Sequence, residues 1–124
     1  MAIINLTQHA PTVEQIREGV VSFDGEALEA LKKALTFDDL PQKLEITRRA
    51  VAIAEMAADA GFGPGDGAMI GGAPYLMSAL EQALTEREIR PLYSFSVRES
   101  IEQTLPDGCV KKTHIFRHLG FVWL

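Results

Sequence analysis

The sequence contains very little cysteine and no long apolar run. One cysteine, Cys109, stands among 124 residues, which excludes a disulfide within the chain and favours a reducing compartment. No apolar stretch approaches the roughly 20 residues that cross a bilayer. No basic segment followed by an apolar core marks a signal peptide. We therefore expect a cytoplasmic protein that does not enter a membrane.

Positive charge is also scarce. Lys and Arg number 12 against 17 Asp and Glu, and the net charge is −5. This balance argues against binding to duplex nucleic acid, which calls for a basic patch. Residues 1–86 carry a net charge of −7 and residues 87–124 a net charge of +2. An anionic ligand would find its cations mainly in the last third, although chance fluctuation in a small protein explains the asymmetry as well.

Signatures of metal sites and of common nucleophiles are missing. The three His and the single Cys show no CxxC or HxxxH spacing, so we expect no metal and no cofactor. There is no GxGxxG fingerprint, Walker A loop or GxSxG elbow. These absences leave two expectations, a reaction that needs no metal or binding without turnover.

Hydrophobic periodicity predicts a single α/β domain over residues 1–124. Short apolar runs with few polar residues predict strands, and apolar residues spaced by three and four predict helices. A capping box at Thr12 and Gln15 marks one helix start. The predicted strands are residues 2–7, 68–72 and 89–96. The predicted helices are residues 12–19, 25–37, 38–61 and 73–88. A hairpin over residues 97–116, around the turn "LPDG", is predicted to precede a last strand at residues 116–124.

This order predicts a layered α/β structure. Its central sheet is expected to be mainly parallel, with right-handed crossovers between the first three strands. The C-terminal hairpin is expected to add an antiparallel edge.

The turn after the second predicted strand is the first candidate for a ligand site. Gly71 and Gly72 let a backbone approach a ligand closely, and the helix start at Ala73 and Tyr75 offers unpaired N–H groups to an anion. Ligands in open α/β sheets bind beyond the carboxyl ends of the strands. Glycines at such turns are also common for packing alone, so both interpretations stay open.

Three further polar segments are expected near the same edge. Thr7, Gln8 and His9 follow the first strand, and His9 suits acid–base work near neutral pH. Ser96 and Arg98 end the third strand, where Arg98 can grip a phosphate with two N–H groups. Lys112 lies in "KKTHIFRH", which can equally be a charged edge strand that guards against aggregation. A surface histidine and a surface ion pair of Arg98 are the plain alternatives.

Four segments together resemble the small Csx-type CRISPR-associated proteins, a group with Rossmann-like folds that includes ring nucleases. The resemblance covers both ends and most of residues 66–119, and departs at Ile70-Gly71-Gly72. The segments are "NLTQHAPTVEQ", "DGAMIGGAPYLMSAL", "REIRPLYSFSVRES" and "LPDGCVKKTHIFRH", and the matching positions are Thr7, His9, Thr12, Glu14, Gln15, Asp107, Gly108, Lys111, Lys112, Phe116 and His118.

The resemblance implies a Rossmann-like three-layer sandwich. It also implies a homodimer that binds a cyclic oligoadenylate second messenger across its two-fold axis. Metal-independent cleavage would proceed by attack of a ribose 2′-OH on the adjacent phosphate. We expect His9, Ser96 and Arg98 to be catalytic. Thr7, Gln8, Gly71, Gly72, Ala73, Tyr75 and Lys112 are expected to bind the ligand. The alternative is a non-catalytic protein of a mobile element or antiviral defence system that binds or sequesters a nucleotide.

Overall fold

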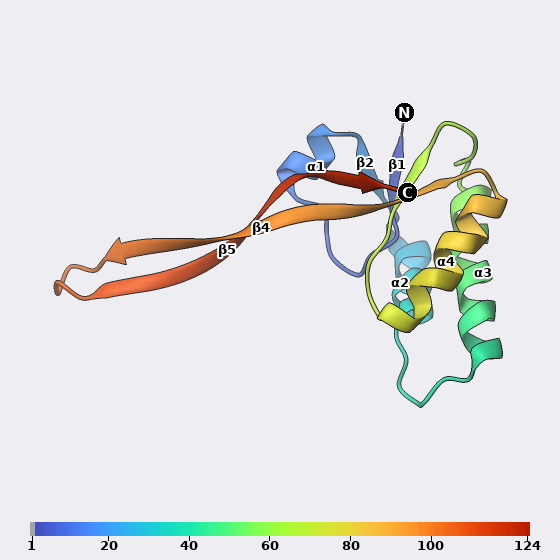
Figure 1. Cartoon of the computed structure of the whole chain (residues 1–124), viewed down its shortest axis with the longest axis horizontal. Helices are drawn as coiled ribbons and strands as arrows, with labels where there is room; N and C mark the ends of the chain where they lie inside the picture. Colours follow the sequence, from blue (N-terminus) through green and yellow to red (C-terminus); the bar gives the residue numbers. More distant parts are fainter. Residues whose placement is uncertain (1) are drawn as a thin grey trace.

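The computed structural model describes residues 2–124. Short strands and helices alternate through most of the chain, and two long strands end it (Figure 1). In chain order the elements are β1 (Ile3–Asn5), α1 (Val13–Arg17), β2 (Val20–Ser22), α2 (Gly25–Leu35), α3 (Lys43–Asp59), β3 (Gly67–Met69), α4 (Pro74–Glu86), β4 (Arg90–Thr104) and β5 (Val110–Trp123).

The strands form one sheet in the order β2-β1-β3-β4-β5. The strand β1 pairs in parallel with β2 and β3, and β3 pairs in parallel with β4. The last pair, β4 and β5, is antiparallel. The predicted mixed α/β architecture, with a mostly parallel sheet and a C-terminal antiparallel pair, is therefore confirmed.

The direction of winding reverses between β1 and β3. From β1 the chain passes through α1 to β2, and from β3 it passes through α4 to β4 on the opposite side. Crossovers of one hand that run in opposite directions place their helices on opposite faces of a sheet. Figure 1 shows α1 on one side and α2, α3 and α4 together on the other. The loops after β1 and β3 consequently diverge at the carboxyl edge of the sheet.

The two faces of the sheet are covered unequally. Ile4 and Ala68 belong to the main core, a large buried cluster with the apolar sides of α2, α3 and α4. Ile3 and Met69 point to the other face, where the cluster is small and is completed by Val20, Leu92, Phe121 and Trp123. Within residues 2–124, α1 is the only helix on this second face, and it has five residues. Much of this face is therefore covered by C-terminal aromatic side chains instead of helices.

The C-terminal third differs from the prediction. The sequence predicts a strand, a hairpin and a further strand, whereas β4 runs unbroken from Arg90 to Thr104 and β5 from Val110 to Trp123. A register shift between Phe95 and Ser96 lets the pair bend without ending. One pair of strands therefore serves both the sheet and the projection beyond it.

Two smaller differences concern the first half of the chain. The strand β2 is not predicted, because its three residues are too few to show a period. The long helix begins at Lys43 instead of residue 38, since Pro41 lies in the preceding loop. The predicted capping box is confirmed, with the Thr12 side chain accepting from Gln15 N–H and the Gln15 side chain accepting from Thr12 N–H.

Beyond the bulge, the hairpin leaves the sheet as an arm, defined here as residues 96–118. Figure 1 shows it projecting well away from the helices. His118 is buried at its base, and most other arm residues are exposed. An arm with two uncovered faces gains little stability from its own residues.

Among residues 2–124, no helix combines the length and the apolar content needed to cross a membrane.

Candidate functional site

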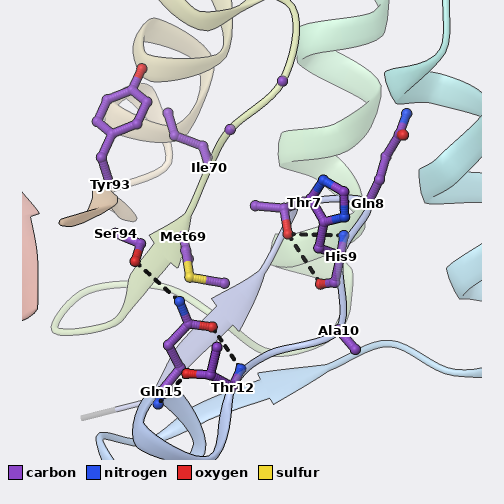
Figure 2. A pocket seen from close by; sticks show the side chains of 12 residues that line it. Thr7, Gln8, His9, Ala10, Thr12, Gln15, Met69, Ile70, Tyr93 and Ser94 are labelled. Carbon is purple, nitrogen blue, oxygen red and sulfur yellow. Dashed lines mark hydrogen bonds between the residues drawn. The ribbon is translucent and has the colours of Figure 1, made fainter. Parts of the chain in front are cut away.

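A pocket of about 420 Å³ opens at the carboxyl edge of the sheet, where the winding reverses. The loop after β1, the turn after β3, the first part of β4 and the start of α1 form its walls (Figure 2). We call it the β1–β3 pocket. Its lining residues are Thr7, Gln8, His9, Ala10, Thr12, Gln15, Met69, Ile70, Gly71, Gly72, Tyr93 and Ser94.

The loop after β1 is held by the side chain of Asn5. This side chain is buried, and its Oδ1 accepts from Thr7 N–H at 2.9 Å and from Thr7 O–H at 2.7 Å. Its Nδ2 donates to the carbonyl oxygen of His9 at 2.8 Å. An Asn side chain that turns back onto the following residues fixes a tight turn. Asn5 therefore positions the wall that presents Thr7, Gln8 and His9.

Replacing Asn5 with alanine is expected to lower the free energy of unfolding by about 1 kcal/mol. Thr7 N–H loses its acceptor, and the His9 carbonyl loses the Asn5 donor and keeps the Thr7 hydroxyl at 3.2 Å. Water reaches part of this loop and limits the cost. Chemical denaturation measures the change. The control is Thr47→Ala, which removes an exposed hydroxyl within α3. An Asn5→Ala protein as stable as that control would show that the loop does not depend on this side chain.

The turn after β3 is formed by Gly71 and Gly72. Gly72 has φ +139°, which disfavours any residue with a side chain. Gly71 has an ordinary φ, and a Cβ placed there would lie 3.6 Å from the Thr7 methyl group, an ordinary contact. Within residues 2–124, no hydrogen bond uses the N–H of either glycine. The turn therefore has two backbone donors free to meet a ligand.

Tyr93 forms another part of the wall and is tied to α4. Its hydroxyl donates to Oε2 of Glu81 at 2.8 Å. Burial, assisted by the hydrogen bond and the negative charge of Glu81, raises the pKa of Tyr93 from 10.0 to about 12. The pocket consequently contains a neutral phenol over the whole physiological range.

Titration of Tyr93 by tyrosinate absorbance, in a Tyr75→Phe background, is expected to give a pKa of about 12. Since the folded pKa lies above the unfolded one, the associated stability is present below about pH 10 and is lost as the pH rises toward about 12. Replacing Glu81 with glutamine should lower the Tyr93 pKa in part, because burial remains. A titration unchanged by Glu81→Gln would contradict this pairing.

Ser94 connects the pocket to a buried histidine. Its Oγ lies 2.7 Å from Nδ1 of His118 and 3.1 Å from Nε2 of Gln15. Nε2 of His118 lies 3.3 Å from Oε2 of Glu18. The His118 side chain is 1% exposed, and the Phe121 ring lies against it with centroids 4.7 Å apart. A polar chain thus runs from the pocket through Ser94 and His118 to Glu18.

The electrostatic character of the pocket differs from that of the whole chain. The chain has 17 acidic residues and a net charge of −5. None of the described residues that line the pocket is Asp or Glu. A second hollow of about 450 Å³, beside the loop between α2 and α3, is lined by Asp38, Asp39 and Glu45 as well as two arginines. Of these two hollows, only the β1–β3 pocket is free of carboxylates.

Half of the predicted site residues meet in the pocket. Thr7, Gln8, His9, Gly71 and Gly72 all line it. Their meeting follows from the parallel pairing of β1 with β3, which brings the carboxyl ends of the two strands to one edge.

The other predicted residues lie outside the pocket of the same chain. Ala73 caps α4, and Tyr75 faces the ring of Phe37, with centroids 5.2 Å apart. Ser96, Arg98 and Lys112 lie on the arm, because β4 continues past the edge where a strand end is predicted. Lys112 pairs there with Glu102 at 3.8 Å.

Sequence reasoning does not predict several functional positions of the site, among them Asn5, Gln15, Ser94 and His118. Asn5 follows two isoleucines and looks like the end of a strand. Gln15 is predicted as a helix cap and matches the resemblance, but no pocket role is predicted for it. Ser94 and His118 stand 24 positions apart, so their contact depends on the hairpin register. Among residues 2–124, no three His, Cys, Asp or Glu side chains form a group suited to a metal ion.

A family model described as "Uncharacterized protein MJ1673 family" matches residues 1–122. No curated protein and no solved structure matches the chain. The match includes every residue that lines the pocket, and the family description mentions no ligand, activity or relation to Csx-type proteins.

Proposed function

The chain belongs to the MJ1673 family, and we propose that it binds a cyclic oligoadenylate second messenger in the β1–β3 pocket. Cleavage is proposed to need no metal and to proceed by attack of a ribose 2′-OH on the adjacent phosphate. The observation that carries the proposal is a pocket without carboxylates, at the winding reversal of a strongly acidic chain.

The position of the pocket supports a nucleotide ligand. The strand order β2-β1-β3-β4-β5 is the order of one common doubly wound, Rossmann-like fold, whose ligands bind at the reversal between the first and third strands. Among the described residues, the second face has only the short helix α1, and β5 is antiparallel, so the Rossmann-like description is part of the proposal.

The lining groups suit a phosphate flanked by a ribose and a base. The free N–H groups of Gly71 and Gly72 are proposed to bind the phosphate oxygens, with Gln8 donating beside them. Met69, Ile70 and Tyr93 supply apolar surface for a base. His9 is exposed at the pocket wall, where it is proposed to protonate the leaving oxygen.

A dimer is proposed because one pocket of about 420 Å³ is smaller than a ring of several nucleotides. The uncovered arm is the surface proposed to contact a second copy. Phe116, which is 73% exposed, opposes Arg98 across the arm, and Lys112 lies on the same face. Burying Phe116 against a partner would carry Arg98 and Lys112 into the interface. In this arrangement the two cations reach the ligand of the neighbouring pocket.

Incubation with cyclic tetra-adenylate, followed by chromatography of the products, tests the proposal. Linear products that end in a 2′,3′-cyclic phosphate support binding with cleavage. Intact ring recovered from the denatured complex supports the alternative, a protein that sequesters the nucleotide. A chain that retains no ring at any concentration would contradict both.

A further inference from the structure

The hydrogen bonds around Ser94 have a direction that the side chains determine. Oε1 of Gln15 accepts from Thr12 N–H at 2.9 Å, so the amide nitrogen of Gln15 faces Ser94 and donates to it. The Ser94 hydroxyl proton then has two acceptors within reach, Nδ1 of His118 at 2.7 Å and Oγ of Ser96 at 3.3 Å, and the histidine nitrogen is the nearer. A neutral imidazole that accepts at Nδ1 has its own proton on Nε2. That nitrogen faces the carboxylate of Glu18.

We propose that Ser94, His118 and Glu18 form a proton relay that serves the β1–β3 pocket. Ser94 is the member that lines the pocket, and His118 and Glu18 act through it. The arrangement has the logic of a serine–histidine–carboxylate triad, in which a carboxylate orients the ring and stabilises the charge it gains. The proposal rests on the proposed function for its substrate, a ribose 2′-OH next to a phosphodiester.

The relay supplies the proton transfer that the attacking hydroxyl needs. The 2′-OH proton passes to Ser94 Oγ while the Ser94 hydroxyl proton passes to Nδ1 of His118. The 2′-oxygen forms a bond to phosphorus, and the bond from phosphorus to the 5′-oxygen breaks. The 5′-oxygen leaves with a proton from His9. His118 then returns its proton to solvent through Ser94, and His9 takes one up again.

A second serine–histidine pair in the chain serves as a matched control. Ser100 Oγ lies 3.1 Å from Nδ1 of His114, a contact similar to that of Ser94 with His118. Both side chains are exposed on the arm, and none of the ion pairs within residues 2–124 joins His114 to a carboxylate. Comparing the two serines shows how much burial, the Glu18 carboxylate and the pocket add to the reactivity of Ser94.

The first test measures cleavage and affinity for cyclic tetra-adenylate separately. Ser94→Ala and His118→Asn are expected to slow cleavage about 100-fold, with the dissociation constant of the ring changed by less than about threefold. Glu18→Gln is expected to slow cleavage about 10-fold. Ser78→Ala, at an exposed position of α4 outside the pocket and the arm, should leave both quantities unchanged. Wild-type cleavage rates in Ser94→Ala and His118→Asn would overturn the relay while leaving the proposed function intact.

A second test needs no nucleotide and decides the relay even if the ring does not bind. A fluorophosphonate probe should label Ser94: the serine oxygen bonds to phosphorus, fluoride leaves, and the hydroxyl proton moves to His118. Peptide mass mapping is expected to find label on Ser94 in the wild type, far less in His118→Asn, and none on Ser100. Absence of label on Ser94, or equal labelling in His118→Asn, would overturn the relay.

Discussion

Replacing Gly71 with phenylalanine is expected to weaken binding of cyclic tetra-adenylate at least about 100-fold. The turn after β3 tolerates a side chain at this position, since φ is ordinary and a Cβ meets only the Thr7 methyl group at 3.6 Å. A large ring there would occupy the wall shared with Thr7 and displace the phosphate from the backbone donors. Equilibrium titration of a fluorescent ring analogue measures the loss.

The matched control is Gly71→Ala, which adds one methyl group at ordinary contact distance. It should bind the ring within about threefold of the wild type, and both variants should unfold at similar denaturant concentrations. Tight binding by a stable Gly71→Phe protein would mean that the ligand site lies elsewhere.

The Phe116→Ser substitution is expected to raise the dissociation constant of the dimer about 30-fold or more. Phe116 is 73% exposed in the single chain, so the change costs the fold little. A buried aromatic anchor contributes about 2 kcal/mol or more to an interface. Sedimentation equilibrium over a range of protein concentrations measures the shift.

Leu40→Ser is the control for this experiment. Leu40 is 96% exposed in the loop between α2 and α3, away from the arm, and its substitution should leave the dimer unchanged. A wild-type chain that stays monomeric at all concentrations, or a Phe116→Ser dimer of wild-type strength, would contradict the proposed role of the arm.

The sequence predicts the main layers of the fold and one side of the pocket. The capping box at Thr12 and the helix-breaking glycines mark helix ends through neighbouring residues alone. These helix ends can therefore be predicted without knowledge of the tertiary structure. The meeting of Thr7–His9 with Gly71 and Gly72 follows from a general rule about parallel strands. These features depend on short-range patterns and on topology alone.

The other side of the pocket depends on strand length and register. Side chains point alternately to the two faces of the strand throughout residues 90–104. No local signal in the sequence therefore shows where β4 leaves the sheet. Arg98 and Lys112 are consequently predicted at the edge, whereas they lie on the arm. The contact between Ser94 and His118 requires a register shift at Phe95 and Ser96, which no turn motif announces.

Isothermal titration calorimetry of cyclic tetra-adenylate into the wild-type chain tests the central claim most directly. Because two copies are proposed to share one ring, saturation is expected at one ring per two chains, and the heat should vanish in Gly71→Phe. Saturation at one ring per chain would contradict the shared cleft. Absence of any binding heat across the range, with no ring retained on the protein, would contradict the ligand itself.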